Sequence, residues 1–509
     1  MRRKTIKKWV LGITLTVITG SIVSCLGVKS QINQHLGKKT ELVNTSNFKT
    51  SSGSIAIKNI SALSSDCSQM LDSLTVLIKD GKIINVAKQV DITSDYTIVD
   101  GTGKYLIPGL IDTHVHLKNS KNDLLLYVAN GITYVGEMTG SKRHLQWREE
   151  AKSGSLSPRI YVATRKVGSQ KGIIRKIKGA FFDQPLNYTK TKKARKAVQK
   201  FKEQGFDAIK LNGTLNKEIY EAITNEAKKH NVPAIGHLSF SVGLDGLYSS
   251  GQSQLSHIEE ITKNTMEDYT GIVYNTPNEY LDYLNQKSDS IAIKLKESNI
   301  IVASTISVIE SVPKQNFDIE NFLESIELEY ENPGLIEGSK LAKGWLPGNN
   351  SYENMEIKNN PELVRKSKIF WETYVKAYYI MTKALIRNGV TITVGTDANV
   401  TGVIPGFSLH DELESLSKCG MSNSKILHAA TIAPAQWMQS ETGKIKIGYD
   451  ADLVILEKNP LIDIKNSRTI NTVIVNGKLL NRKELDSILQ SVKEANNRSR
   501  KISIDKFIN

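Results

Sequence analysis

The strongest constraint on the fold is a series of short apolar segments that alternate with helical patterns from residue 108 onward. Helix-forming stretches with apolar residues on one side separate several of these segments, as in TKKARKAVQKFKEQG at 191–205. Eight strands, each followed by a helix, are typical of an α/β protein built as a (β/α)8 barrel. The predicted strands span 110–117, 132–138, 159–164, 208–212, 233–238, 254–258, 301–305 and 391–397.

The two flanks of this region have a different pattern. Segments 54–106 and 443–485 alternate apolar and polar residues, and KDGK at 79–82 contains the Asp-Gly pair of a tight hairpin turn. We therefore predict one small β-sandwich built from both chain ends, with the barrel at 107–442. Residues 25–53 are polar and are predicted to form a flexible tether, and 486–509 a charged C-terminal tail.

The first 24 residues resemble a bacterial lipoprotein signal peptide. A basic head precedes an apolar run at 9–23, which is shorter than the roughly 20 residues that a membrane-spanning helix needs. The segment IVSC at 22–25 resembles a lipobox, which implies cleavage before Cys25 and acylation of its thiol. A simple cleaved signal and an uncleaved anchor are the alternatives. We expect an exported protein that a lipid at Cys25 attaches to the membrane of the bacterial cell envelope, on its periplasmic or outer surface.

Charge and cysteine content exclude some partners and cofactors. The net charge is +15, but the lysines are spread along the chain without a basic stripe between aromatic residues, so no nucleic-acid partner is expected. Cys67 and Cys419 could form a disulfide in an exported protein, although none is predicted. No CxxC motif is present, which argues against a cysteine zinc site. The sequence is compatible with a homo-oligomer.

Four of the nine histidines fall at the carboxyl ends of predicted strands, where barrel enzymes carry their active sites: His114, His116, His237 and His257. The first two are two residues apart and therefore point to the same side of a strand. One inward histidine is more often a hydrogen-bonded core residue, but four together favour a metal site, since imidazole is the commonest metal ligand. The other candidate is a substrate contact at His410, which begins a helix after the last strand; His144, His230 and His428 lie in polar helical stretches.

Two further groups complete the predicted site. Asp397 ends the eighth strand, and Lys210 lies inside the fourth, although a lysine is almost never buried alone. With a lowered pKa, Lys210 could react with carbon dioxide and give a carbamate, a carboxylate on a long arm that can bridge two metals. The predicted metal ligands are therefore His114, His116, Lys210, His237, His257 and Asp397.

The motifs IPGLIDTHVH, AIKLNG, IGHLS, LSHIEE and VGTDA resemble the amidohydrolase superfamily, and the similarity extends over about 54–480. Within it, the chain is similar to the branch of imidazolonepropionase and of the Xaa-Pro or Xaa-Arg dipeptidases with a carboxylated lysine. The resemblance implies two divalent metal ions, with zinc expected, and carboxylated Lys210 as the bridging ligand. His114, His116 and Asp397 would hold one ion, and His237 and His257 the other. One departure is Gly136, where relatives often have arginine.

These features predict a hydrolase that cleaves an amide-type C–N bond in a small molecule: a dipeptide, an N-acyl amino acid or a cyclic amide. A metal-bridging hydroxide would attack the carbonyl, and Asp397 would act as the proton shuttle. The same binuclear site could also serve a lactonase or a phosphotriesterase. The third alternative is a catalytically inactive surface-binding lipoprotein.

Overall fold

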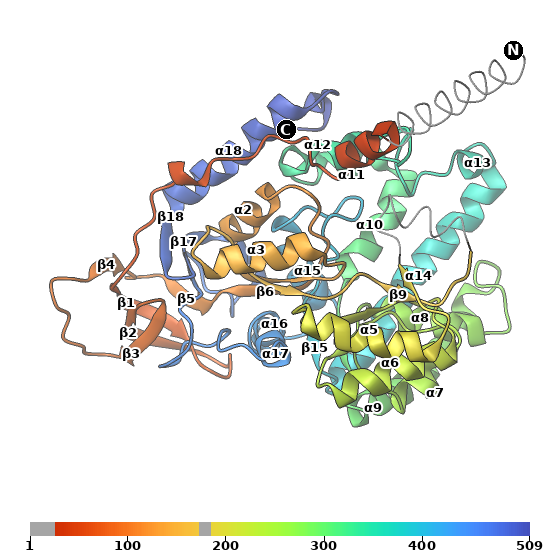
Figure 1. The fold of residues 1–509 in the computed structure, drawn as a ribbon, viewed down its shortest axis with the longest axis horizontal. Coiled ribbons are helices and arrows are strands. Elements are labelled where there is room, and N and C mark those ends of the chain that lie inside the picture. Colours follow the sequence, from red (N-terminus) through yellow and green to blue (C-terminus); the bar gives the residue numbers. More distant parts are fainter. Residues whose placement is uncertain (1–25, 173–184, 509) are drawn as a thin grey trace, which may run out of the picture.

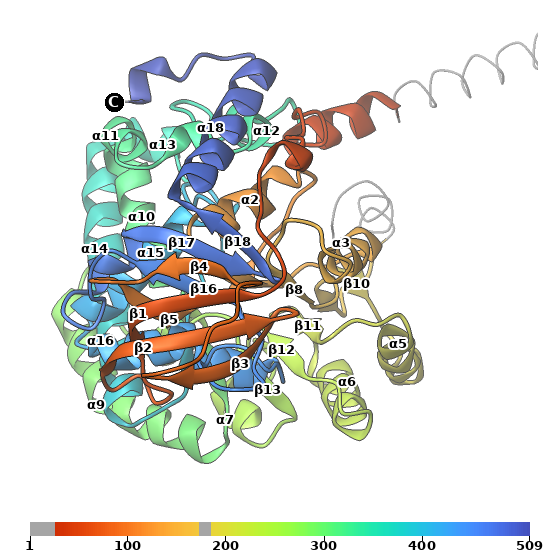
Figure 2. The same ribbon diagram turned by 90° about the vertical axis from the view of Figure 1, so that its left-hand side faces the viewer.

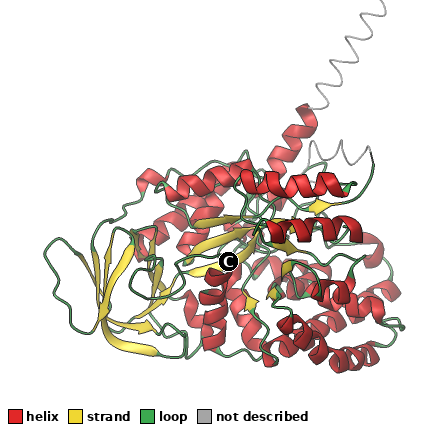
Figure 3. Cartoon of the chain, turned by 60° about the horizontal axis from the view of Figure 1, so that its bottom comes forward, coloured by secondary structure: helices red, strands yellow, loops and turns green. Residues whose placement is uncertain are grey.

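The computed structural model describes residues 26–172 and 185–508, so the predicted signal peptide and Cys25 lie outside the described residues. Two parallel sheets lie within a layer of helices, and a mixed sheet lies to one side of them (Figure 1 and Figure 3). Within the described residues, no helix combines the length and the apolar character needed to cross a membrane.

All eight predicted strands are present, and each pairs in parallel with its sheet neighbours. Five of the six residues of the fourth and fifth strands are apolar or small, which fits strands covered on both faces. The strands are β6 (Leu110–Val115), β7 (Ile132–Glu137), β8 (Arg159–Val162), β11 (Ile209–Leu211), β12 (Ala234–Gly236), β13 (Gln252–Leu255), β14 (Ile301–Ala303) and β15 (Ile392–Thr393).

Every residue of β6, β11 and β12 is buried.

These strands form two hydrogen-bonded sheets. One has the order β6-β7-β8, and the other has the order β10-β9-β11-β12-β13-β14-β15, in which β9 (Val167–Gly168) and β10 (Leu186–Asn187) were not predicted. Isolated parallel bridges join Val115 to Ala398 and Ala163 to Ala208, which links β6 to the segment after β15 and the segment after β8 to the one before β11. The predicted single barrel is thus present as two linked sheets. Asp397 has a positive φ of 63°, so the extended strand cannot continue through it.

Helices surround the parallel sheets and bury one face of each against them (Figure 1). In α5, the predicted apolar side of Ala194, Val198 and Phe201 is buried and the lysines face solvent. The surrounding helices are α2 (Asn122–Ala129), α3 (Lys142–Lys152), α5 (Thr191–Glu203), α6 (Lys217–Lys229), α7 (Gly243–Tyr248), α8 (Glu259–Asp268), α9 (Pro277–Glu297), α10 (Ile306–Phe317), α11 (Ile319–Glu324), α12 (Pro333–Glu337), α13 (Met355–Lys358), α14 (Pro361–Arg387), α15 (Phe407–Lys418), α16 (Asn423–Ala430) and α17 (Ile432–Trp437).

Strands from both chain ends join in one mixed sheet (Figure 2). The antiparallel pairing of β5 (Tyr105–Pro108) with β16 (Leu453–Leu456) connects the N-terminal strands to the C-terminal ones. Asp80 and Gly81 both have positive φ in the predicted turn between β2 and β3. The described strands belong to a single sheet, and a second, facing sheet of a sandwich remains a prediction. The strands are β1 (Ile55–Leu63), β2 (Met70–Lys79), β3 (Lys82–Ala87), β4 (Thr97–Asp100), β5 (Tyr105–Pro108), β16 (Leu453–Leu456), β17 (Ile470–Val475) and β18 (Lys478–Asn481).

Residues 26–53 differ from the flexible tether that their polar composition predicts. Residues 26–35 are helical, and Ile32 is buried against the rest of the chain. The amide of Asn119 donates to the carbonyl oxygen of Leu36 over 2.9 Å, and the Thr40 hydroxyl donates to the Asn332 side chain over 3.1 Å. These contacts attach the segment to the loops after β6 and before α12.

The predicted C-terminal tail is also packed. Most of it forms α18 (Arg482–Ser499), which buries Leu485, Ile488 and Val492 at helical spacing. At its end, the guanidinium of Arg498 donates two hydrogen bonds of 2.9 Å to the carboxylate of Glu41. The two terminal segments therefore lie against each other as well as against the fold.

Candidate metal centre

Side chains from five strands meet at the carboxyl end of the two parallel sheets. His114 lies in β6 and Lys210 in β11, whereas the other four residues lie in the loops after β6, β12, β13 and β15, within four residues of the strand ends. The structure therefore brings together all six predicted ligands: His114, His116, Lys210, His237, His257 and Asp397.

The first half of the cluster is built around Asp397. Its Oδ1 lies 2.8 Å from Nε2 of His116 and 3.3 Å from Nε2 of His114. One ligand atom from each of these three residues lies within 4.8 Å of the other two, an arrangement that could hold a metal ion. Nζ of Lys210 lies 3.5 Å from Nε2 of His114.

The remaining two histidines continue the same cluster. The ring of His257 has its centroid 4.6 Å from that of His114 and 5.2 Å from that of His237. Lys210 also donates a hydrogen bond of 2.5 Å to the hydroxyl of Ser256, the residue before His257. Lys210 therefore lies beside His114 and beside the residue that precedes His257.

Each of the four imidazoles uses Nδ1 for a contact with the protein. His114 Nδ1 lies 3.2 Å from the carbonyl oxygen of Ser256, and His237 Nδ1 lies 2.6 Å from Oε1 of Glu260. Carbonyl and carboxylate oxygens accept hydrogen bonds, so these two Nδ1 atoms carry the hydrogen. The lone pair of a neutral ring is then on Nε2, the atom that remains available to a metal.

Two threonine hydroxyls contact Nδ1 of the other two imidazoles. Thr139 Oγ1 lies 3.1 Å from Nδ1 of His116, and Thr305 Oγ1 lies 3.1 Å from Nδ1 of His257. The Thr139 hydroxyl donates its single hydrogen to Oε1 of Glu137 over 3.0 Å, so it can only accept from His116. Glu137 thereby selects the same tautomer for His116 as the carbonyl of Ser256 selects for His114.

Burial favours the uncharged forms that ligate metals. It lowers the pKa of His114 well below its ordinary value and that of His257 to about 3. Burial, together with repulsion from Lys166, lowers the pKa of Lys210 to about 7. A neutral amine at Lys210 is therefore well populated near neutral pH, as carbamate formation requires.

The donor set fits a divalent cation. It combines neutral imidazole nitrogens with the carboxylate of Asp397, which are ligands that zinc accepts. Oδ1 of Asp397 is buried and makes no hydrogen bond of acceptable geometry with any described residue, although two imidazole nitrogens lie near it. A buried oxygen without a donor is costly, and a bound cation would satisfy it.

Residues 105–480, most of the chain, match the amidohydrolase family. The chain belongs to this family. It is 24% identical over 451 residues to the 5'-deoxyadenosine deaminase of Methanosphaera stadtmanae, which covers 84% of this chain and 93% of that protein. This amidohydrolase is therefore an enzyme that hydrolyses C–N bonds.

Solved structures with the same fold have other substrates in their names. A bottromycin amidohydrolase is 18% identical, with a TM-score of 0.64 and coverage of 87% of this chain and 90% of that one. A Xaa-Pro dipeptidase with bound methionine in its active site is 19% identical, with a TM-score of 0.58 and coverage of 84% and 100%. At this identity the likeness establishes the fold alone.

Two glycines explain how the backbone reaches this geometry. Gly236 has φ of 128°, and a Cβ there would lie 2.5 Å from the carbonyl oxygen of Leu211, so only glycine lets β12 approach β11 beside Lys210 and His237. A Cβ on Gly136 would lie 2.5 Å from the carbonyl oxygen of Thr113. This contact leaves no room for a larger side chain at the position where relatives often have arginine.

The structure does not bring His410 to the cluster. Its Nδ1 lies 2.8 Å from the hydroxyl of Ser467, and its Nε2 lies 3.1 Å from the carbonyl oxygen of Asn130. Both ring nitrogens are thus occupied, and burial lowers the pKa of His410 to about 3. His410 therefore packs inside the fold and does not make the predicted substrate contact.

Cys67 and Cys419 are both buried free thiols.

Sequence reasoning missed the residues that orient the imidazoles. Glu137 and Glu260 are buried acids next to predicted strand ends, and this unusual placement is the signal that could have identified them. Thr139 and Thr305 gave no such signal, because threonine is common in strands and loops alike.

Proposed function

We propose that this amidohydrolase cleaves the amide bond of a dipeptide or an N-acyl amino acid, with two divalent cations and a carboxylated Lys210. The observation that carries the proposal is the position of Lys210. It is fully buried, its Nζ lies 3.5 Å from Nε2 of His114, and its pKa is about 7. An unmodified ammonium at this position would repel the cations that the surrounding ligands fit.

Carboxylation of Lys210 would replace this repulsion with attraction to the cations. The neutral amine of Lys210 forms a bond to the carbon of carbon dioxide, one amine proton leaves, and the product carries a negative charge. His114, His116 and Asp397 would then hold one cation, and His237 and His257 the other, with Lys210 between them. The depressed pKa supports this reaction because only the free amine has the lone pair that it needs.

When bound, the cations would lower the pKa of water and polarise the scissile carbonyl. Asp397 is the group that moves the proton. Its side chain is 15% exposed, and two imidazoles lie beside its Oδ1. It would accept a proton from the attacking water and deliver it to the leaving nitrogen. Glu137, Thr139 and Glu260 hold the imidazoles in place during these transfers.

Deamination is a second candidate, because the named sequence relative is a 5'-deoxyadenosine deaminase that this chain matches over 93% of its length. Both reactions hydrolyse a C–N bond, but deamination releases ammonia and amide hydrolysis releases an amino acid. Measuring which of these products is released therefore distinguishes the two candidate reactions.

The test is a substrate panel for the zinc-loaded protein, with Asp397→Asn as the matched control. The panel contains dipeptides, N-acyl amino acids, cyclic amides and 5'-deoxyadenosine, and the assays measure released amino acid and released ammonia. Release of amino acid that Asp397→Asn abolishes supports the proposal. Turnover of 5'-deoxyadenosine alone would establish the deaminase instead.

We also propose, from the IVSC motif, that a lipid at Cys25 attaches the enzyme to the bacterial cell envelope. Metabolic labelling with a palmitate analogue tests this. The intact chain should incorporate the label and Cys25→Ala should not, whereas equal labelling of both would contradict the proposal.

A further inference from the structure

A cavity of about 340 Å³ lies between the N-terminal helical segment and the loops that follow β6 and β7. Leu117, Lys118 and Asn119 line it, and they directly follow His116 in the chain. Thr139 also lines it, and its hydroxyl contacts Nδ1 of His116. The cavity therefore adjoins the loops that carry and orient one of the candidate metal ligands. Its volume is in the range of small-molecule sites.

The charged residues that line this cavity all have a positive charge, whereas the buried Glu137 lies behind the lining residue Thr139. Lys29, Lys118 and Arg143 line it, and no aspartate or glutamate is among the described residues that do so. Such a wall attracts an anionic group, and arginine in particular matches a carboxylate with two parallel hydrogen bonds.

His144 lies in the wall of the cavity beside the buried Glu137. It lines the cavity and is only 5% exposed, yet its Nδ1 makes no hydrogen bond with any described residue. The carboxylate of Glu137 is 3.8 Å away, which is too far for a hydrogen bond. Because Nδ1 of His144 has no exposed surface, an anion in the cavity would be held by the three cations and not by this ring nitrogen.

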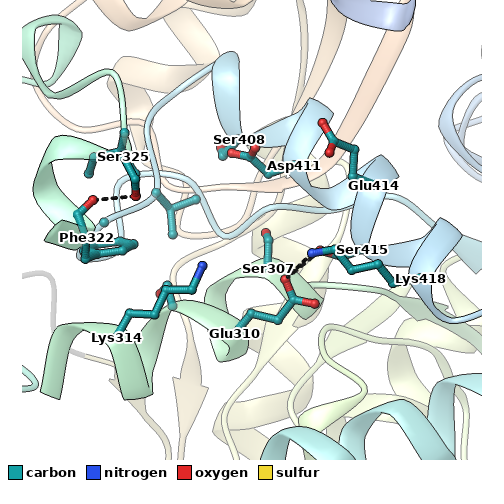
Figure 4. A pocket seen from close by; sticks show the side chains of 14 residues that line it. Ser307, Glu310, Lys314, Phe322, Ser325, Ser408, Asp411, Glu414, Ser415 and Lys418 are labelled. Atoms are coloured by element: carbon teal, nitrogen blue, oxygen red, sulfur yellow. Dashed lines mark hydrogen bonds and ion pairs between the residues drawn. The ribbon is translucent and has the colours of Figure 1, made fainter. Parts of the chain in front are cut away.

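A second cavity, of about 140 Å³, differs from the first in the charge of the residues that line it (Figure 4). It lies between α10 and α15, and both signs of charge line it. Glu310 there accepts hydrogen bonds from the Ser415 hydroxyl over 2.9 Å and from the Lys418 ammonium over 3.2 Å. Its acidic residues Glu310, Asp411 and Glu414 are paired with cations of the protein, and their presence gives the cavity no comparable preference for an anion.

We infer that the cavity beside His116 is a subsite for the carboxylate of the substrate, and that the N-terminal segment forms one wall of it. Lys29, Ile32 and Leu36 come from residues 26–36, outside the 105–480 region that matches the family. Ile32 packs this segment onto the fold, and the Leu36 carbonyl oxygen binds the amide of Asn119. The identity of the carboxylate as a substrate group rests on the proposed function.

The test measures binding of two probes to the zinc-loaded protein by isothermal titration calorimetry. N-acetyl-L-leucine carries the carboxylate, and N-acetyl-L-leucinamide is its neutral counterpart. The test variant is Lys29→Glu with Arg143→Glu, both of which are exposed. The matched control, Lys192→Glu with Arg195→Glu, makes the same charge change on the exposed side of α5.

The wild-type protein should bind the carboxylate probe about tenfold or more tightly than the amide. The test variant should lose this preference, and the control should keep it. The inference is overturned if the wild-type protein shows no preference, or if the preference survives in the test variant, because the carboxylate would then bind elsewhere. A protein that keeps the preference but hydrolyses no amide would contradict the proposed function and leave the subsite intact.

Discussion

The hydroxyl of Thr139 lies 3.1 Å from Nδ1 of His116, and the same oxygen lies 3.0 Å from Oε1 of Glu137. Glu137 also accepts hydrogen bonds from the backbone amides of Leu117 and Thr139, over 2.5 Å and 2.6 Å. One buried carboxylate therefore fixes the loops after two neighbouring strands and the orientation of one imidazole.

Thr139→Val should weaken metal binding, because it keeps the shape of the side chain but removes the hydrogen bond to His116. Loss of such an orienting partner typically costs about 10- to 100-fold in metal affinity. Competition with a fluorescent zinc chelator measures the change. Thr139→Ser, which keeps the hydroxyl, should retain affinity close to that of the wild-type protein, and equal affinities for the valine variant and the wild type would argue against the assigned role.

Lys210→Ala should reduce the metal content of the chain, because it removes the ligand that is predicted to bridge the two cations. Short carboxylates such as propionate should restore part of the activity by occupying the vacated space. Metal analysis and activity with and without propionate measure both effects. Lys200→Ala, at an exposed position of α5, is the control. Full activity of Lys210→Ala without propionate would rule out the bridging role.

Asp397→Asn should keep part of the metal but lose nearly all turnover, since an amide cannot accept the proton from water. A positioned acid–base group contributes about 10²- to 10⁴-fold to the rate. Metal content and kcat measured on the same preparation separate binding from catalysis. Loss of metal and turnover in equal proportion would show that Asp397 acts as a ligand only.

His410→Gln should make the free energy of unfolding depend less steeply on pH below about 6.5. The pKa of His410 is about 3 in the folded chain against an ordinary 6.5, so the unfolded chain binds one more proton between these values. Stability therefore falls as the pH drops from about 6.5 toward 3, by at most about 1.4 kcal/mol per pH unit from this group. Urea unfolding at pH 7, 5.5 and 4.5 measures the slope for both proteins, and parallel slopes would contradict this assignment.

The sequence predicts the strands and the cluster well because both depend on local patterns. His114 and His116 lie two residues apart on one strand, and Lys210 and Asp397 are charged residues at the ends or interiors of apolar strands. Such residues are conspicuous because burial makes them costly. Their convergence then follows from the parallel arrangement of the strands.

Contacts between distant segments could not be predicted in this way. Ile32 and Leu36 have helical spacing, but two apolar residues in a polar stretch do not reveal that the stretch is docked. The pairing of Glu41 with Arg498 joins opposite ends of the chain, and the Glu137–Thr139–His116 contacts depend on the shapes of two loops. His410 shows the converse, because its place at a helix start suggested a ligand contact that the packing of α15 excludes.

Anomalous diffraction from crystals of the zinc-loaded protein tests the central claim most directly. We predict two peaks at the carboxyl end of the parallel sheets, one beside His114, His116 and Asp397 and the other beside His237 and His257. Electron density for Lys210 should extend beyond Nζ as a carbamate between them. A single peak, peaks elsewhere or an unmodified Lys210 would contradict the account.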